Sequence, residues 1–577
     1  MSHSPTDRVR AAYRRIAEAD RPEVWITLCD EHDLLVAAKE IEDRLAGGEQ
    51  LPLAGLLVAV KDNIDVAGLP TTAACPSYAY TPGDSATSVR RLTDAGALVL
   101  GKTNLDQFAT GLVGTRSPYG AVRHAHLPER ISGGSSSGSA VAVALGIADL
   151  ALGTDTAGSG RVPAALHGLV GLKPTLGLVP NTGVVPAARP YDCVTVFAAT
   201  LTLAQRGIAA MTGPDPLDPR SRTWPDSVRL AAGAHPRVAV PDAAGLAPLS
   251  AAASAAFHAA AERLEAGGAV VEAIDVRPFL TAATLLYEGA LVAERYAAVG
   301  EFLEGRAGGA DGAGSADDGI DPTVAGIILA AKQLPAYRLA ADLERLDRHR
   351  VTAAAALAGF DALLLPTTTG HPTLAEVRAE PVAVNSRMGV YTNFVNLLDM
   401  AAVAVPAGTA DGGPFGVSVI TRAFDDQIGI DIAALLTGEQ ADVPLPPTGI
   451  DLAVFGAHLR GHPLNGELTT LGARFAGTVA TAPEYRMFAL PTEPPKPGVL
   501  RVAAGGAALP GERWTLSPAA LGRFLAGLPA PMSLGVIELD DGGTVLGFHC
   551  NSVAAEAGVD ITHHGGWPAY LASAPER

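Results

Sequence analysis

The sequence predicts an α/β fold of layered strands and helices, followed by a smaller second domain. Apolar runs of strand length alternate with amphipathic segments of helix length through the first 440 residues. The chain has 577 residues, which is more than one typical domain contains. The proline-rich stretch ADVPLPPTG interrupts the pattern at 441–449. We therefore expect a first domain over 1–440, a linker over 441–450 and a second domain over 451–577.

Hydrophobic periodicity gives the order of the elements within this frame. Short apolar runs bounded by Gly, Pro or Asn predict strands, and longer runs with a period near 3.6 predict helices. The expected elements, in chain order, are helices within 8–48, a buried strand within 55–66 that leaves the core at Lys61, a helix and then a strand within 85–104, helices within 249–268 and 323–357, core strands within 360–368 and 400–408, and strands at 532–539 and 544–550.

Composition and charge narrow the class of protein. Apolar residues make up 48% of the chain and charged residues 18%, so large cores are readily formed. The formal net charge of −18 argues against nucleic acid as a partner, because phosphate binding needs a basic face. The most apolar segment, Ala140–Leu152, contains Gly146 and Asp149 and is shorter than the roughly 18 to 20 residues of a membrane span. We expect a cytoplasmic protein that binds no membrane.

The sequence predicts no metal-binding site and no disulfide framework. No pair of cysteines has the spacing of metal ligands, and an N-terminal apolar stretch of the signal-peptide type is missing. Reduced thiols in a cytosolic protein are the simplest interpretation. The cysteines are Cys29, Cys75, Cys193 and Cys550.

Three stretches of the first domain carry residues suited to serine chemistry: VAVKDNID with Lys61, GGSSSGSA with Ser135, and GTDTAGSGR with Ser159. A serine becomes a nucleophile when a base takes its proton, and a lysine can be that base where burial lowers its pKa. A glycine-rich turn can offer backbone N–H groups to a developing oxyanion. Each stretch alone has an ordinary explanation, as a surface lysine or a flexible loop.

Together with GLVGLKPT, these stretches resemble the amidase signature family, which uses a Lys, cis-Ser, Ser triad. The resemblance implies the fold of that family, a mixed central sheet covered by helices. The resemblance implies that Ser159 is the nucleophile, that Lys61 is the base, and that Ser135 is the cis-serine that relays the proton between them. It places the oxyanion hole in the backbone N–H groups of Thr156, Ala157 and Gly158. The other serines of the run, Ser136, Ser137 and Ser139, are then structural.

Asp155 and Arg161 flank Ser159 in the same stretch. Two interpretations stay open for them. Either they hold the turn that carries the nucleophile in position, or they form an ordinary structural ion pair. Such a pair would still contribute to stability, because breaking a buried pair costs about 3–5 kcal/mol.

More specific segments of the first domain resemble the allophanate hydrolase subgroup of that family. The main ones are LDQFATGLVGTRSPYGAVR at 105–123 and LLYEGALVAERYAAV at 285–299. The subgroup uses a Tyr and an Arg in the second stretch to hold the substrate carboxylate, and Tyr287 and Arg295 match them. Eight residues would place both on one face of a continuous helix. The alternative is that Arg295 pairs with Glu288 or Glu294.

This resemblance implies a function. The enzyme would hydrolyse allophanate to ammonia and carbon dioxide without a cofactor, in urea or s-triazine nitrogen catabolism. A homodimer and a functional link to a separate urea carboxylase are expected with it. Three alternatives remain: another small-amide amidase, the amidase subunit of an aminoacyl-tRNA amidotransferase, and a non-catalytic scaffold that keeps the fold.

The second domain begins with VFGAHLRGHPLNGELTTLGARF at 454–475, which resembles the C-terminal domain of allophanate hydrolases and, more faintly, the γ-glutamylcyclotransferase-like fold. This resemblance implies an α+β class for the smaller domain. In some relatives this domain is proposed to decarboxylate the first product, N-carboxycarbamate, with a histidine. The candidates here are His458 and His462. The family often has PLNHQL where this chain has PLNGEL, with Gly466 in place of a histidine, so a purely structural or assembly role stays open.

Overall fold

The computed structural model describes residues 4–307, 319–440, 443–446, 449–493 and 495–573. Two compact units make up the chain, and Trp224–Ala234 belongs to the second of them, although the sequence places it in the first domain. Backbone hydrogen bonds hold this segment there, from Leu230 N–H to the Gly472 carbonyl and from Ala519 N–H to the Asp226 carbonyl. The predicted linker over 441–450 lies partly outside the described residues.

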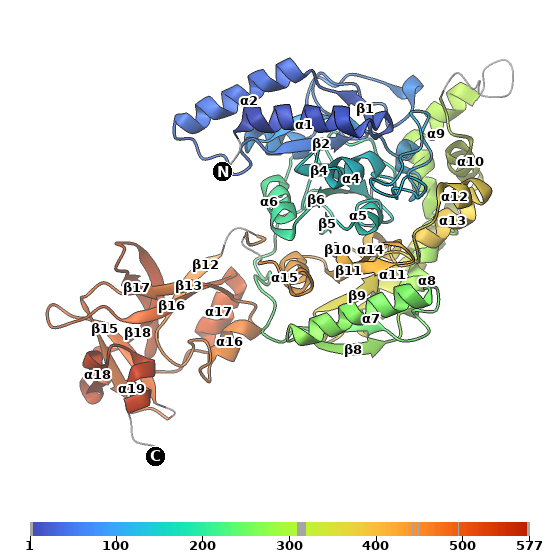
Figure 1. Ribbon diagram of the computed structural model, residues 1–577. Coiled ribbons are helices and arrows are strands. Elements are labelled where there is room, and N and C mark those ends of the chain that lie inside the picture. Colours follow the sequence, from blue (N-terminus) through green and yellow to red (C-terminus); the bar gives the residue numbers. More distant parts are fainter. Residues whose placement is uncertain (1–3, 308–318, 441–442, 447–448, 494, 574–577) are drawn as a thin grey trace. The chain divides into compact units, whose positions relative to one another are not determined.

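The first unit is built on one mixed sheet of eleven strands (Figure 1), as the sequence predicts. Antiparallel pairs form the middle of the sheet, parallel pairs flank them on both sides, and the outermost pair at one edge is antiparallel again. In spatial order the strands are β1 (Trp25–Leu28), β3 (Leu98–Thr103), β2 (Leu57–Lys61), β4 (Leu150–Asp155), β6 (Cys193–Ala198), β5 (Val170–Lys173), β10 (Met400–Ala410), β11 (Gly413–Arg422), β9 (Ala362–Pro366), β7 (Arg237–Pro241) and β8 (Val270–Ile274).

Two neighbouring strands of this sheet bring distant parts of the sequence to one edge. All residues of β2 and β4 are buried, which fits strands covered on both faces. They run parallel, with Val60 opposite Leu152. Because parallel strands end at the same edge of a sheet, Lys61 at the end of β2 and Asp155 at the end of β4 come together there.

Helices cover both ends and the faces of the sheet (Figure 1). Helix α4 is buried along nearly its whole length and packs on β4 and β2, so the apolar run after the serines is core. The main helices are α1 (Pro5–Ala19), α2 (Glu31–Ala46), α3 (Thr87–Asp94), α4 (Ser137–Ala144), α5 (Val162–His167), α6 (Leu201–Met211), α7 (Ala251–Ala266), α8 (Arg277–Thr284), α9 (Ala293–Ala307), α10 (Pro322–Ala330), α11 (Ala336–Ala356), α12 (Leu374–Ala379), α13 (Pro381–Met388), α14 (Phe394–Leu397) and α15 (Asp426–Thr437).

One element near the N-terminus differs from the prediction. The segment 8–48 is not helical throughout, because Trp25–Leu28 forms β1 and pairs antiparallel with β3. Its apolar residues lie between two helices, so local periodicity carries no separate strand signal. Pairing with the sheet edge decides the conformation.

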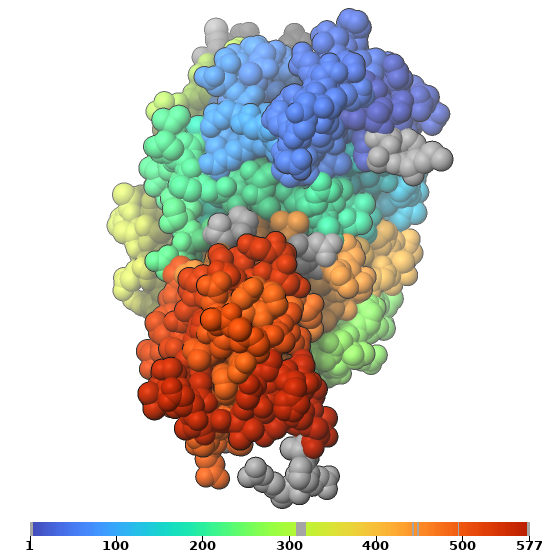
Figure 2. Space-filling model, turned by 90° about the vertical axis from the view of Figure 1, so that its left-hand side faces the viewer, coloured from blue at the N-terminus to red at the C-terminus, as the bar shows by residue number. Residues whose placement is uncertain are grey.

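The second unit has its own core and two small sheets, and Figure 2 shows it in orange and red as one continuous body. Its α+β class agrees with the prediction, and its similarity to the γ-glutamylcyclotransferase-like fold stays a prediction. The elements are β12 (Ile450–Val454), α16 (Asn465–Thr470), β13 (Arg474–Ala480), β14 (Tyr485–Leu490), β15 (Lys496–Arg501), β16 (Pro510–Leu516), α17 (Pro518–Ala526), β17 (Met532–Glu538), β18 (Thr544–Cys550), α18 (Ser552–Ala557), β19 (Val559–Asp560) and α19 (Trp567–Ser573).

In neither unit does any helix of the described residues have the length and apolar character needed to span a membrane.

Candidate active site

Lys61 is fully buried at the end of β2, and among the described residues its side-chain nitrogen bonds to two hydroxyl groups and to no carboxylate. Its Nζ lies 2.8 Å from Ser135 Oγ and 2.8 Å from Thr154 Oγ1. Burial lowers the pKa of Lys61 to about 7, and buried aspartates nearby, Asp106 first among them, oppose this effect only in part. A lysine in this environment is partly neutral near pH 7, so it can act as a base.

Ser135 reaches Lys61 because the preceding backbone is tightly confined. The Gly134–Ser135 peptide is cis, as the family resemblance implies. A Cβ on Gly134 would clash with Asp106 Oδ2, so no larger residue fits at this position. The Asp106 carboxylate in turn accepts hydrogen bonds from the backbone N–H groups of Gly114 (3.0 Å) and Arg116 (3.0 Å). A folded loop thus holds the serine in place.

The neighbouring serines bond to the backbone of surrounding strands and loops, as expected for structural residues. Ser136 Oγ donates to the Thr154 carbonyl at 3.2 Å. Ser137 Oγ donates to the Asn104 carbonyl at 3.2 Å, and Ser139 Oγ to the Leu152 carbonyl at 2.8 Å. These bonds attach the serine run to β4, so Ser135 is fixed relative to the turn that follows this strand.

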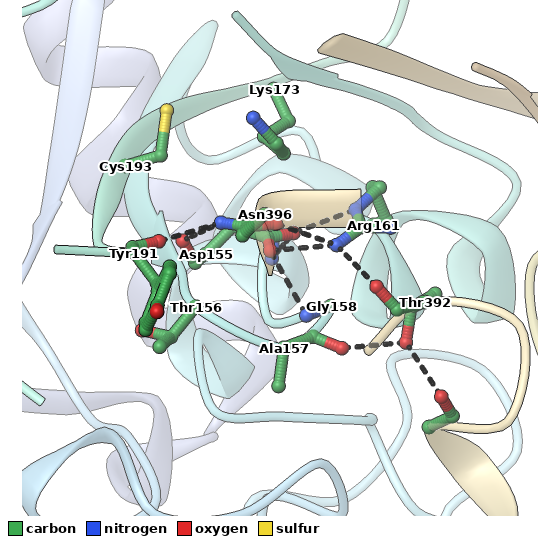
Figure 3. Close-up of polar contacts among 12 residues, drawn as sticks. Asp155, Thr156, Ala157, Gly158, Arg161, Lys173, Tyr191, Cys193, Thr392 and Asn396 are labelled. Atoms are coloured by element: carbon green, nitrogen blue, oxygen red, sulfur yellow. Dashed lines mark hydrogen bonds and ion pairs between the residues drawn. The ribbon is translucent and has the colours of Figure 1, made fainter. Parts of the chain in front are cut away.

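The turn that carries Ser159 is organised by the carboxylate of Asp155 (Figure 3). Asp155 accepts hydrogen bonds from Gly158 N–H at 2.9 Å and from Gly160 N–H at 3.0 Å. Gly158 has φ +134°, and a Cβ there would clash with Thr392 Oγ1, so glycine is required on both counts. Thr392 Oγ1 closes the turn by donating to the Ala157 carbonyl at 2.6 Å.

Ser159 itself is 2% exposed, and its Oγ has no hydrogen-bond partner within the part of the chain that the structure describes. The structure corrects the predicted oxyanion hole at one of three residues. Gly158 N–H is already bonded to Asp155, so it is not available to a substrate oxygen. For Thr156 and Ala157, no acceptor of the N–H lies among the described residues. These two groups stay candidates.

Asp155 and Arg161 form a fully buried ion pair with two hydrogen bonds, 2.9 Å from Nε and 2.8 Å from Nη2 (Figure 3). Burial alone would raise the pKa of Asp155, but Arg161 holds it below its ordinary value. Asn396 Nδ2 donates to the Asp155 carbonyl at 2.8 Å. The same carboxylate therefore makes the structural pair and fixes the turn, so the two interpretations are not exclusive.

Tyr287 and Arg295 are in contact, but they do not lie on one continuous helix as predicted. Helix α8 ends at Thr284 and α9 starts at Ala293, so a turn and the short 3-10 helix Ala290–Val292 separate the two residues. Arg295 Nη2 donates to Tyr287 Oη at 2.7 Å, and Nη1 donates to Thr110 Oγ1 at 2.8 Å. Arg295 is 2% exposed. It forms no ion pair with a glutamate of the described residues, so the predicted alternative of a pair with Glu288 or Glu294 is not adopted.

Several residues of this region escaped sequence reasoning. Thr154 contacts Lys61, Thr110 holds Arg295, and Asp106 and Asp192 are buried carboxylates next to the candidate groups. Asp192 accepts a hydrogen bond from Thr156 Oγ1 at 2.5 Å. The quoted stretches already contain three of them, Thr154 in GTDTAGSGR and Asp106 and Thr110 within 105–123, whereas Asp192 lies outside every quoted stretch. No group of three or more His, Cys, Asp or Glu placed to hold a metal ion occurs among the described residues.

The second unit contains a separate cavity of about 610 Å³ that His458 lines and His462 does not. His458 Nε2 lies 3.0 Å from Glu467 Oε2. Its ring stacks on Phe548, with centroids 5.0 Å apart, and meets the edge of Phe524. Burial lowers the pKa of His458, and Glu467 opposes this shift. Of the two predicted histidines, only His458 has the surroundings of a functional group.

Comparisons with known proteins agree with this architecture. The amidase family model matches residues 7–428, and the model of the allophanate hydrolase C-terminal domain matches residues 450–572. Urea amidolyase of Saccharomyces cerevisiae is 41% identical over 593 aligned residues, covering 95% of this chain and 31% of that protein. The chain thus spans about a third of the length of this curated relative.

Two further relatives match over most of their own length. A relative from Symbiobacterium thermophilum, one subunit of a glutamyl-tRNA(Gln) amidotransferase, is 36% identical, with 74% of this chain and 92% of that protein covered. The structure of Kluyveromyces lactis allophanate hydrolase superposes with a TM-score of 0.87 at 38% identity, covering 99% of this chain and 97% of that one. The chain therefore belongs to the amidase family and, within it, to the allophanate hydrolases.

Proposed function

We propose that the chain hydrolyses allophanate, releasing ammonia and carbon dioxide, with Ser159, Ser135 and Lys61 as the reacting groups. The contact between the buried, partly neutral Lys61 and Ser135, at the sheet edge that also carries the Ser159 turn, is the observation that carries the proposal. Membership of the allophanate hydrolases supports the choice of substrate.

In the proposed mechanism, neutral Lys61 takes the proton of Ser135, which takes that of Ser159. The Ser159 oxygen forms a bond to the terminal amide carbon, and the carbonyl oxygen becomes an oxyanion. The N–H groups of Thr156 and Ala157 are the proposed donors to this oxygen. The C–N bond then breaks, and the stored proton returns through Ser135 to the departing ammonia. Water cleaves the acyl-enzyme by the same route.

Arg295 is proposed to hold the substrate carboxylate, with Tyr287 as its partner. A guanidinium can bind a planar carboxylate through two parallel hydrogen bonds. The bonds from Arg295 to Thr110 and Tyr287 fix the direction in which the guanidinium points. Substrate choice then depends on a charge that neutral amides lack.

A second role is proposed for the cavity of the second unit, namely decarboxylation of the first product, N-carboxycarbamate. In that step the C–N bond breaks, carbon dioxide leaves and the nitrogen takes a proton, which His458 supplies and regains from water. The pairing of His458 with Glu467 in a largely apolar cavity favours this role. His458→Ala should delay carbon dioxide release relative to the first ammonia, whereas His462→Ala should not.

The substrate assignment is tested by measuring ammonia release from allophanate, malonamate, biuret and glutamine under the same conditions. We expect kcat/KM to be highest for allophanate. Preference for glutamine, with stimulation by partner subunits, would instead identify an amidotransferase component. Preference for an uncharged amide would identify another small-amide amidase, and inertness towards all four would favour a scaffold.

Three sequence predictions about the surroundings of the enzyme remain predictions: a homodimer, a cytoplasmic location and a functional link to a separate urea carboxylase. The likeness to a protein named urea amidolyase supports the last of these. Light scattering on the purified protein would determine the oligomeric state.

A further inference from the structure

A cavity of about 690 Å³ in the first unit is lined by more positively than negatively charged side chains. Four arginines line it, against two aspartates, in a chain whose net charge is −18. The arginines are Arg189, Arg220, Arg222 and Arg350, and the aspartates are Asp192 and Asp399. A cavity that concentrates positive charge in an acidic protein focuses the local field and attracts anions.

Two of these arginines are already bound to protein groups. Arg222 Nη1 contacts both carboxylate oxygens of Asp399, at 2.8 and 3.0 Å. Arg350 donates to the Leu397 carbonyl at 3.1 Å and to Asp347 at 2.9 Å. Both are therefore fixed parts of the cavity wall.

Arg189 and Arg220 differ from the other two. Both are exposed, and neither side chain makes a hydrogen bond or an ion pair with any described residue. Their donors face a cavity large enough for a small anion and its water. They are therefore the groups available to an anionic ligand.

The cavity lies next to the candidate active site. Its Asp192 accepts a hydrogen bond from the Thr156 hydroxyl, and its Tyr191 packs in one apolar cluster with Ala157, so it borders the turn with the proposed oxyanion donors. Glu294, at the start of α9, gives a second link. Burial raises the pKa of Glu294, and Arg220 and Arg189 oppose the rise, which places both arginines within electrostatic range of the residue before Arg295.

We propose that this cavity is a second anion-binding site, which takes small carboxylate anions through Arg189 and Arg220 beside the catalytic turn. Its role in catalysis, which rests on the proposed function, is to raise the local concentration of the anionic substrate next to Arg295. Attraction of this kind weakens with ionic strength, because the Debye length is about 10 Å at 0.1 M salt.

The site is tested first by binding alone, without turnover. Malonate, a small dicarboxylate, is titrated calorimetrically into Ser159→Ala protein at low ionic strength. We expect two sites: Arg295→Gln removes one, and the double variant Arg189→Gln/Arg220→Gln removes the other. The control, Arg10→Gln/Arg14→Gln on the exposed side of α1, removes the same charge and keeps both. A single site that depends only on Arg295, or equal weakening in the control, overturns the proposal.

Kinetics then tests the role of the site. The Arg189→Gln/Arg220→Gln variant should lower kcat/KM for allophanate by about three- to tenfold at low salt, through KM, and approach wild type at high salt. Hydrolysis of a neutral amide should not change. An unchanged kcat/KM for allophanate, or an equal loss on both substrates, overturns this role. If allophanate is not hydrolysed at all while the second malonate site persists, the proposed function fails and the anion site stands.

Discussion

In the first unit the groups around Lys61 are polar, buried and joined by hydrogen bonds, whereas in the second unit His458 lies in a cavity lined mainly by apolar side chains. Lys61, Ser135 and Asp155 each have fixed partners on neighbouring strands and turns. Among the described residues, His458 has one polar side-chain partner, Glu467, which is more than half exposed.

This difference bears on what each unit can do. A site that develops charge during reaction needs donors that are held in position before the substrate arrives, because reorganising them costs part of the rate gain. The first unit has such a network, tied together by the Asp155 carboxylate and by the serine run. The second unit has a cavity of about 610 Å³ lined by one imidazole. This arrangement suits a reaction step whose main requirement is a proton donor. We therefore expect mutations in the first unit to have the larger effects on turnover.

The largest effect is expected from Ser159→Ala. Removing the nucleophile should lower kcat for allophanate by about three orders of magnitude or more, because members of a triad act as one unit. The thermal unfolding temperature should stay close to wild type, since the Ser159 hydroxyl has no partner among the described residues. Near-normal turnover in the purified variant would show that another group attacks the amide.

Lys61→Ala should be almost as damaging, and the wild-type pH profile should reveal the same group. Lysine acts as a base only when neutral, and burial lowers its pKa to about 7. In wild type, kcat/KM should therefore fall as the pH drops below about 7 and level off above it. A flat profile from pH 5.5 to 8.5, together with an active Lys61→Ala protein, would show that Ser135 is activated by something else.

Arg295→Ala should have an intermediate effect that depends on the substrate. Losing a charge-assisted hydrogen bond costs about 1.5–3 kcal/mol, or roughly ten- to a few-hundred-fold in kcat/KM for allophanate. Arg295→Lys should restore little, because an ammonium cannot make two parallel bonds. Tyr287→Phe should cost less, since one neutral hydroxyl is lost. A neutral amide serves as the control, and equal losses on both substrates would mean that these residues support the fold.

The smallest effect on the first ammonia is expected from removing the second unit. A chain ending at Pro446 should fold and release this ammonia within about twofold of the wild-type rate, because the network around Lys61 lies wholly in the first unit. The cut leaves Leu230, which is buried against the second unit's residues, without cover. His458→Ala in the full chain is therefore the matched control. An inactive truncated protein beside an active His458→Ala protein would show that the second unit completes the first.

The sequence by itself determined the α/β class, the order of most elements and the stretches that contain the candidate site. The periodicity of strands and helices is a local property of the sequence, and each motif around Lys61, Ser135 and Ser159 is a continuous segment of it. It also selected Tyr287 and Arg295, but for a geometry that the chain does not adopt. The roles of these residues stay proposals.

Only the tertiary structure decided which groups meet. Packing of strands and loops brings Thr154 to Lys61 and Thr110 to Arg295. It also places the Asp155 carboxylate where it accepts a hydrogen bond from Gly158 N–H. The same holds for β1 and for Trp224–Ala234, which take their places through pairing with residues far along the chain. Such contacts depend on long-range packing, and packing energies are shared among residues that no local pattern connects.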